Sequence, residues 1–176
     1  MFRLPTNRRA MTIRHSIGAE AAVDSIDGGL TAKPAWYAKG LRFECTQCGN
    51  CCSGGPGAVW FTLAEEEAMA KELELTLEVF HARYTRRIGA RYSLKELLRN
   101  GAHDCVFLDR DTQPGKAICS IYHARPTQCR TWPWWSEVME SPAAWEDTKQ
   151  RTPCPGMNKG TLHSLVEITI GLSGGA

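Results

Sequence analysis

The sequence lacks long hydrophobic runs. Every apolar stretch in its 176 residues is soon interrupted by a charged residue, glycine or proline, so none reaches the roughly 18 residues that a membrane-spanning helix needs. The N-terminal segment is basic and contains Arg8 and Arg9, yet no apolar core of about 7–15 residues follows them, as a signal peptide requires. We therefore expect no membrane partner and predict a cytoplasmic protein.

Net charge is also low. The 21 Lys+Arg and 19 Asp+Glu residues give a formal charge of +2, which is too small for the electrostatic footprint of a nucleic-acid-binding protein. The small basic excess lies in the first 44 residues, which have little hydrophobic periodicity. We interpret residues 1–42 as a flexible, disordered leader, and the sequence leaves open whether translation starts at Met1 or Met11.

Common catalytic motifs are absent as well. The glycine-rich segment at residues 53–57 lacks the Lys-Ser/Thr ending of a phosphate-binding loop, and we interpret it as a turn wrapped around a site. The sequence has no Ser-His-Asp arrangement, no metalloprotease motif and no CxxxCxxC motif of the radical S-adenosylmethionine enzymes. Whether the protein is an enzyme therefore stays open, and no catalytic residue is assigned.

Cysteine, by contrast, is abundant. The eight cysteines are fewer than the ~8–10% of residues typical of a disulfide scaffold, but too many for ordinary packing residues. In a reducing compartment, clustered cysteines favour metal or redox roles over disulfide bonds. Four of them form the pattern CxxCxxCC at Cys45, Cys48, Cys51 and Cys52. Gly49 can adopt a positive φ, which predicts a tight metal-binding knuckle with backbone N–H groups turned toward the sulfur atoms.

The number of cysteines matches two complete metal sites. A structural zinc ion takes four ligands and a cubane iron–sulfur cluster usually takes four thiolates. Because adjacent side chains normally diverge, we expect Cys51 and Cys52 to face different sites. Each site should combine part of the first cluster with part of the later cysteines, and the membership of each site stays open. The predicted metal ligands are Cys45, Cys48, Cys51, Cys52, Cys105, Cys119, Cys129 and Cys154.

Two arginines and two histidines lie close to these cysteines in sequence. Arg125 and Arg130 flank Cys129, where they can stabilise thiolates through charge-assisted N–H···S contacts. His103 and His123 are expected to be surface or hydrogen-bonded residues, because eight cysteines already suffice as ligands.

Capping residues predict three short helices. The first covers residues 63–73 and has Thr62 as its N-cap. The second starts at residue 77 after Thr76, and the third covers residues 94–99 after Ser93. A further short helix is expected around Trp145.

A β-hairpin is predicted in the second half of the cysteine-containing region. Strand-like runs at residues 105–108 and 117–122 flank a polar loop centred near residue 112. This hairpin would place Cys105 opposite Cys119, close enough for both to serve one site. The Trp-rich segment at residues 131–135 is expected to pack in the core or to shield a cluster from water.

The cysteine segments CTQCGNCC, CVFLD, CSIYHARPTQCRTWPWW and CPG resemble the YkgJ-like cysteine-cluster family, a family of zinc- or iron-chelating CxxCxxCC domains. The resemblance covers residues 43–160, and each of the eight cysteines matches a cysteine of the family pattern. It implies a metal-binding domain, and the family is often labelled as iron–sulfur oxidoreductase. A related domain occurs in flagellin lysine methylases, but nothing here resembles a methyl-donor domain.

We therefore predict a small, irregular, metal-stabilised α+β fold with short helices and a β-hairpin. The expected organisation is a leader at residues 1–42, a cysteine-cluster metal-binding domain at residues 43–160, and a tail at residues 161–176. The leading hypothesis is an iron–sulfur protein with up to two [4Fe-4S] clusters and an unidentified redox or protein partner. The alternative is a Zn²⁺-binding structural or interaction module, and a third hypothesis is metal-assisted catalysis or protein modification.

Overall fold

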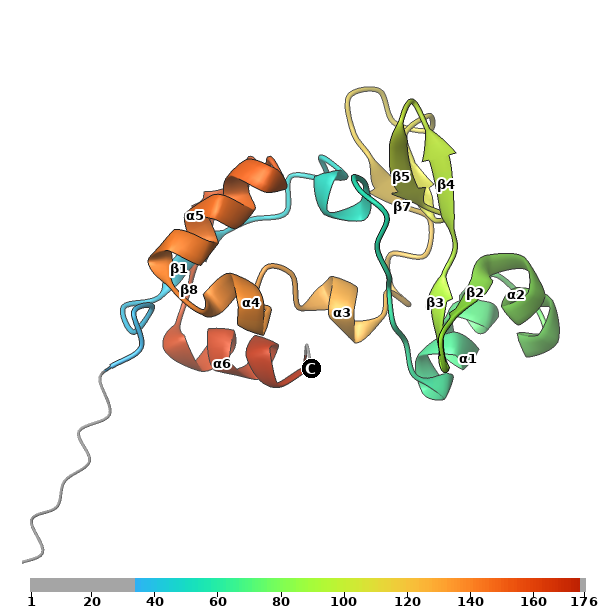
Figure 1. Cartoon of the computed structure of the whole chain (residues 1–176), viewed down its shortest axis with the longest axis horizontal. Coiled ribbons are helices and arrows are strands. Elements are labelled where there is room, and N and C mark those ends of the chain that lie inside the picture. The colour runs from blue at the N-terminus through green and yellow to red at the C-terminus, as the bar shows by residue number, and fades with distance from the viewer. Residues whose placement is uncertain (1–33, 175–176) are drawn as a thin grey trace, which may run out of the picture. The chain divides into compact units, whose positions relative to one another are not determined.

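The computed structural model describes residues 34–174, so the predicted leader lies outside the described residues up to residue 33 (Figure 1). The helices are α1 (Leu63–Glu72), α2 (Leu77–Tyr84), α3 (Thr127–Arg130), α4 (Ser136–Met139), α5 (Pro142–Arg151) and α6 (Leu165–Gly174), with a 3₁₀ turn η1 at Asn50–Cys52. Within residues 34–174, no helix combines the length and the apolar character that crossing a membrane demands.

The strands are short and pair two by two. They are β1 (Leu41–Phe43), β2 (Thr85–Ile88), β3 (Arg91–Leu94), β4 (Glu96–Arg99), β5 (Ala102–Cys105), β6 (Leu108–Asp109), β7 (Ile118–Cys119) and β8 (Met157–His163). The antiparallel pairs are β1–β8, β2–β3, β4–β5 and β6–β7. The predicted irregular α+β class is thereby confirmed. The expected domain limits at residues 42 and 160 fall inside β1 and β8.

The first two predicted helices form where their caps are. The Thr62 hydroxyl accepts a hydrogen bond from Glu65 N at 3.3 Å, and the Glu65 carboxylate accepts one from Thr62 N at 2.8 Å, which completes a capping box for α1. Thr76 caps α2 by accepting from Val79 N at 3.3 Å. The helix expected around Trp145 is α5.

The predicted helix at residues 94–99 is wrong, because these residues form the end of β3 and all of β4. Ser93 does not cap a helix: its hydroxyl is fully buried, accepts from Val59 N at 2.9 Å and donates to Leu94 O at 3.0 Å. Asn100 and Gly101 have φ of 49° and 81°, which suits the two-residue turn between β4 and β5. A long-range contact and a tight turn therefore override the local helix signal.

The predicted hairpin forms, but its expected register is wrong. Leu108 of β6 lies opposite Cys119 of β7, whereas Cys105 ends β5 and lies opposite Glu96. Asp109 shapes the polar loop, since its carboxylate accepts from Asp111 N at 2.8 Å and from Thr112 N at 3.0 Å. Cys105 does not lie opposite Cys119 across the loop centred near residue 112, because Cys105 belongs to β5 and pairs with Glu96 of β4.

The described residues contain two hydrophobic clusters of buried side chains. The Trp cluster contains Trp134, Val138, Met139, Trp145, Cys154, Met157 and Ile168. The Phe cluster contains Met69, Ala70, Phe80, Leu94, Phe107 and Ile121, with Cys105 and Cys119 packed against it. Figure 1 shows α4, α5 and α6, which supply most of the Trp cluster, close to the β1–β8 pair. Cys154 is therefore part of the Trp cluster, and Cys105 and Cys119 border the Phe cluster.

Candidate metal centre

The first cysteines lie on a tight knuckle centred on Gly49. Gly49 has φ of 73°, and its carbonyl accepts a hydrogen bond from Cys52 N at 2.9 Å as η1 begins. A Cβ atom at this position would lie 2.5 Å from Ala117 Cβ and 3.2 Å from Leu108 Cδ1. The predicted positive φ is confirmed, and close packing against the β6–β7 pair is a second reason for glycine.

Gly49→Ala is expected to destabilise the fold by about 2–5 kcal/mol. The left-handed conformation costs an alanine roughly 1–2 kcal/mol, and overpacking against Ala117 adds about 1–3 kcal/mol. Urea unfolding measures the loss. Gly89→Ala is the matched control, because Gly89 also has a positive φ of 60° but a Cβ added there would meet nothing within 4 Å. Equal losses in the two variants would contradict the packing argument.

Six of the eight cysteines line one cavity of about 90 Å³. They are Cys45, Cys51, Cys52, Cys105, Cys119 and Cys129. Five segments supply them: the loop after β1, the 3₁₀ turn η1, the end of β5, strand β7 and helix α3. Most of the other lining side chains are apolar, including Val59, Leu94, Phe107, Ile121, Trp132 and Trp135. Segments spread over 85 residues of sequence thus bring soft sulfur ligands to one apolar space.

Several sequence expectations can be compared with this cavity. Cys105 and Cys119 both line it, although they are not opposite each other in a hairpin. Cys51 and Cys52, expected to face different sites, both line it too, and their sulfur atoms are 3.8 Å apart. All eight cysteines are free thiols. Within residues 34–174, no group of three or more His, Cys, Asp or Glu side chains is arranged so that it could hold a metal ion.

Cys48 and Cys154 lie apart from the cavity lining. Cys154 is only 7% exposed and belongs to the Trp cluster. Two contacts attach the Cys154 turn to the first knuckle: Asn50 Nδ2 donates to Pro153 O at 2.5 Å, and Glu44 N donates to Gly156 O at 3.2 Å. The last cysteine is therefore held beside the first cluster.

Burial keeps several thiols protonated. It raises the pKa of Cys105 to about 11 and that of Cys129 to about 12. The neighbouring thiolates of Cys105, Cys119 and Cys51 raise the pKa of Cys129 further. The hydrogen bond between the Cys51 and Cys52 thiols raises the pKa of Cys51. A cation that binds here must therefore displace protons from the sulfur atoms.

Backbone N–H groups partly offset the effect of burial on the pKa at three of the later cysteines. Burial raises the pKa of the Cys105, Cys119 and Cys154 thiols, and in each case a hydrogen bond from a backbone group two residues later lowers it. The donors belong to Phe107, Ile121 and Gly156. Such donors favour the thiolate. The sequence predicts N–H groups of this kind at the first knuckle, where a backbone hydrogen bond lowers the pKa of Cys51, and the structure also has them at later cysteines.

The two arginines near Cys129 have different surroundings. Arg125 lines the cavity, donates from Nε to Tyr122 O at 3.0 Å, and lies 3.8 Å from the centroid of the Tyr122 ring. Its charge lowers the pKa of Cys119 and Cys129, against the larger effect of burial. Arg125 is therefore a cation beside these thiols, and its Nε donates to a carbonyl oxygen instead of the sulfur atom that the sequence predicted.

Arg130 is directed elsewhere. Its guanidinium donates to Arg125 O and to Thr127 Oγ1, and it lies 3.8 Å from a Glu65 oxygen. Its charge is thus engaged by the chain itself. His123 is exposed beside Tyr122, as predicted, whereas His103 is half-buried and its Nδ1 lies 4.0 Å from a Glu96 oxygen.

A sequence model described as "Putative zinc- or iron-chelating domain" matches residues 44–155, the segment that contains all eight cysteines. The chain belongs to the CxxCxxCC family. The resemblance stated above is confirmed, and metal binding is supported. An uncharacterised protein of Methanocaldococcus jannaschii is 31% identical over 103 residues, which are 58% of this chain and 50% of that protein. The chain thus spans about half the length of this curated relative, and no solved structure matches it.

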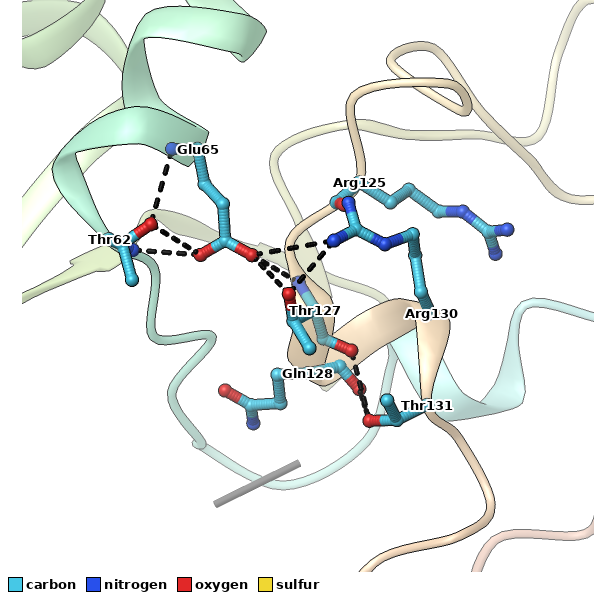
Figure 2. A network of polar contacts seen from close by, with 7 residues as sticks. All are labelled: Thr62, Glu65, Arg125, Thr127, Gln128, Arg130 and Thr131. Carbon is cyan, nitrogen blue, oxygen red and sulfur yellow. Dashed lines mark hydrogen bonds and ion pairs between the residues drawn. The ribbon is translucent and has the colours of Figure 1, made fainter. Parts of the chain in front are cut away.

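A polar network connects the CxxCxxCC domain's helix α1 to helix α3, which contains Cys129 (Figure 2). One Glu65 oxygen accepts from both Thr127 N and Thr127 Oγ1 at 2.6 Å, while the other oxygen accepts from Thr62 N. Although desolvation raises it, hydrogen bonds from Thr127 and Thr62 lower the pKa of Glu65 overall. One carboxylate therefore caps two helices and fixes the start of α3.

Gln128 adds a second attachment for α3. Its side chain accepts from Trp60 N at 2.8 Å and donates to Ala58 O at 3.0 Å. Its own carbonyl accepts from Trp135 Nε1 at 3.0 Å. The short helix of Cys129 is thus held by contacts with Ala58, Trp60, Glu65 and Trp135, and no sequence motif indicated these contacts.

An ion pair between buried Asp104 and half-exposed Arg110 lies close to the knuckle. Asp104 is 3% exposed, and its two oxygens accept from Arg110 Nε and Nη2 at 3.2 Å each. The pKa of Asp104 is lowered, chiefly by this hydrogen bonding. The pKa of Arg110 is raised, mainly by Asp104 and also by the thiolates of Cys52 and Cys48. The pair therefore places a fixed cation near these two cysteines.

Asp104→Asn is expected to destabilise the protein by about 1–3 kcal/mol at pH 7, because Arg110 loses a charged, bidentate acceptor. The pKa of Asp104 is depressed in the folded state, so the pair's contribution is present above the unfolded pKa, about 3.9, and disappears as the pH falls through the lower folded value. Urea unfolding at several pH values measures both effects.

The exposed pair of Asp147 and Arg151 offers the control for this variant. Asp147→Asn should change stability by no more than about 0.5 kcal/mol. A comparable loss in the two variants would show that burial adds nothing to the Asp104 pair.

Proposed function

We propose that this chain is an iron–sulfur protein with a role in electron transfer or redox chemistry. The single observation that carries the proposal is the cavity lined by six cysteines. Six thiols around one space are more than one zinc ion or one cubane cluster takes, and thiolates are the usual ligands of iron–sulfur clusters.

The surroundings of the cavity fit such a cluster. Trp132 and Trp135 line it, with ring centroids 4.8 Å apart, and limit the access of water. Trp132 Nε1 is buried and has no hydrogen-bond partner among residues 34–174. Because buried polar groups normally have a partner, this indole N–H is free to donate to a sulfur atom of a bound group. The cavity thus offers sulfur ligands, apolar walls and one spare donor.

The roles of the chain's own groups follow from these positions. The cysteines would bind the iron, Arg125 would offset the added thiolate charge, and the backbone N–H groups of Phe107 and Ile121 would donate to ligand sulfur atoms. A bound cluster supplies one-electron transfer, with a reduction potential that depends on hydrogen bonds to sulfur and on exposure to solvent. Such thiols stay available in a reducing compartment, which favours the cytoplasm.

The test is the content of iron, zinc and acid-labile sulfide per chain in protein purified without oxygen. We expect about eight iron and about eight sulfide for two cubane clusters, with a broad visible absorption that dithionite bleaches. About two zinc ions with no visible band would overturn the redox function and favour the zinc-binding structural module.

Trp132→Phe is expected to make the reduction potential more negative without lowering the iron content. The phenyl ring keeps the apolar wall but removes the indole N–H, and fewer donors to sulfur stabilise the reduced, more negative cluster less. A redox titration followed by visible absorption measures the shift. Trp36→Phe is the control, because Trp36 Nε1 donates to Met139 O at 2.7 Å and does not line the cavity.

A further inference from the structure

We propose that the pocket lined by Trp60, Arg91 and Glu137 binds a small zwitterion with an apolar body, of the chemical class of the apolar amino acids. This pocket is distinct from the six-cysteine cavity, and the proposal does not depend on which metal the cysteines bind. No sequence motif indicates a ligand site in this part of the surface.

The size and the walls of the pocket suit a small organic molecule. Its volume is about 350 Å³, within the ~300–1,000 Å³ typical of small-molecule sites. The aromatic side chains of Trp60, Phe61 and Trp135 line it. The Trp60 backbone is fixed by an isolated β-bridge to Ser93 and by a 2.8 Å hydrogen bond from its N to Gln128 Oε1. These walls therefore offer held aromatic surface to the apolar body of a ligand.

Most polar groups on the inner wall of the pocket already have partners within the chain (Figure 2). One Glu65 oxygen accepts from Thr127 N and Oγ1 at 2.6 Å each, and the other accepts from Thr62 N at 2.8 Å. Both ends of the Gln128 amide are engaged as well. The charge of Glu65 is therefore taken up by the chain and does not select a ligand.

Two charged side chains of opposite sign are left to do so. Arg91 and Glu137 line the pocket, and neither belongs to an ion pair formed within residues 34–174. The Arg91 guanidinium lies 4.3 Å from the centroid of the Trp60 ring. Because stacking holds the plane of the guanidinium, its N–H groups are ready to bind a carboxylate through two parallel hydrogen bonds. Glu137 accepts from Ser136 Oγ at 3.0 Å and has further acceptor capacity for an ammonium group.

The two charges together select the class of ligand. A simple anion would pair with Arg91 but would enter the same pocket as the negative charge of Glu137. A simple cation would pair with Glu137 and meet the positive charge of Arg91. A zwitterion satisfies both side chains, and its apolar body covers the aromatic walls. An apolar amino acid combines these three features.

The pocket is a neighbour of the candidate metal centre. Gln128 and Trp135 line both the pocket and the six-cysteine cavity. A ligand bound here would therefore lie against two of the side chains that enclose the cysteines.

Titration of the full chain with L-phenylalanine, followed by calorimetry and tryptophan fluorescence, tests the proposal. We expect a dissociation constant on the order of 1 mM, as the usual binding efficiency of a ligand of this size implies. Phenylalaninamide lacks the carboxylate and N-acetylphenylalanine lacks the ammonium group, so each should bind at least about tenfold more weakly. Equal binding of the three probes, or no binding of phenylalanine at about 10 mM, would overturn the proposal.

Two variants connect each charged group of the probe to one side chain. Arg91→Gln should weaken phenylalanine binding at least about tenfold but should not weaken that of phenylalaninamide, which has no carboxylate to lose. Glu137→Gln should weaken phenylalanine binding in the same way and spare N-acetylphenylalanine. Both positions are exposed, so the variants should fold. Arg87→Gln, an exposed position of β2 outside the pocket, is the control and should bind phenylalanine normally. Losses that do not follow this pattern of probes and variants would overturn the assignment.

Discussion

Removal of the metal with a chelator is expected to free the cysteine-containing segments while the Trp cluster stays packed. Structural zinc contributes about 10–16 kcal/mol in zinc-finger peptides, more than most small domains retain as net stability. The η1 turn has no buried residue and β6 and β7 have two residues each, whereas most of the Trp cluster consists of buried side chains of α4, α5 and α6. Hydrogen exchange followed by mass spectrometry should show rapid exchange at residues 45–55 and 117–130.

The control for this experiment is the chelated protein to which the metal has been restored, and it should regain slow exchange in the same peptides. Peptides from α5 and β8 should change little, apart from those next to Cys154. Equal acceleration throughout the chain would mean that the metal supports the whole fold. No acceleration at the knuckle would mean that the cysteine segments are structured by packing alone.

Glu65→Ala is expected to cost about 2–4 kcal/mol of stability and to weaken retention of the metal. Loss of a helix cap costs about 0.5–2 kcal/mol, and Glu65 takes part in capping both α1 and α3. Removing the carboxylate also leaves Arg130 without its charged neighbour. Since α3 contains Cys129, a frayed start of that helix would displace a predicted metal ligand. Urea unfolding and metal content after dialysis measure the two effects.

Two further variants make the Glu65 experiment specific. Glu67→Ala, on an exposed position of the same helix, should change stability by about 0.5 kcal/mol or less. Glu65→Gln should fall between, because its amide oxygen can accept from Thr127 or from Thr62 but not from both. If Glu65→Ala behaved like Glu67→Ala, the connection between α1 and α3 would have no energetic importance.

The elements that could be predicted from sequence are those set by nearby residues. The Thr62 and Thr76 caps act within three residues, and α1 and α2 form as expected. Ser93 resembles a cap in sequence, but its buried hydroxyl accepts a hydrogen bond from the amide of Val59, 34 residues earlier. The adjacent signal at Asn100 and Gly101 is a hairpin signature, and giving it weight would have identified β4 and β5.

In the candidate site, too, the features that could be predicted are those set by residues close together in sequence. The CxxCxxCC spacing identified the cysteines and the positive φ of Gly49, because both depend on a few adjacent residues. Glu65 and Gln128 were missed because their partners lie 62 to 70 residues away in sequence. A glutamate in a capping box has a sufficient local role, so nothing in the sequence indicates its second contact with α3.

The spread of the cysteines along the chain also determines the order in which the thiols are made. Cys45 and Cys154 are separated by about 110 residues, and β1 pairs with β8, which follows Cys154. At a translation rate of about 5–20 residues per second, the ribosome releases the first four thiols roughly 5–20 seconds before the last one. A nascent chain therefore holds a bare cluster of thiols, open to oxidants and to competing ions, before the residues that enclose it have been synthesised.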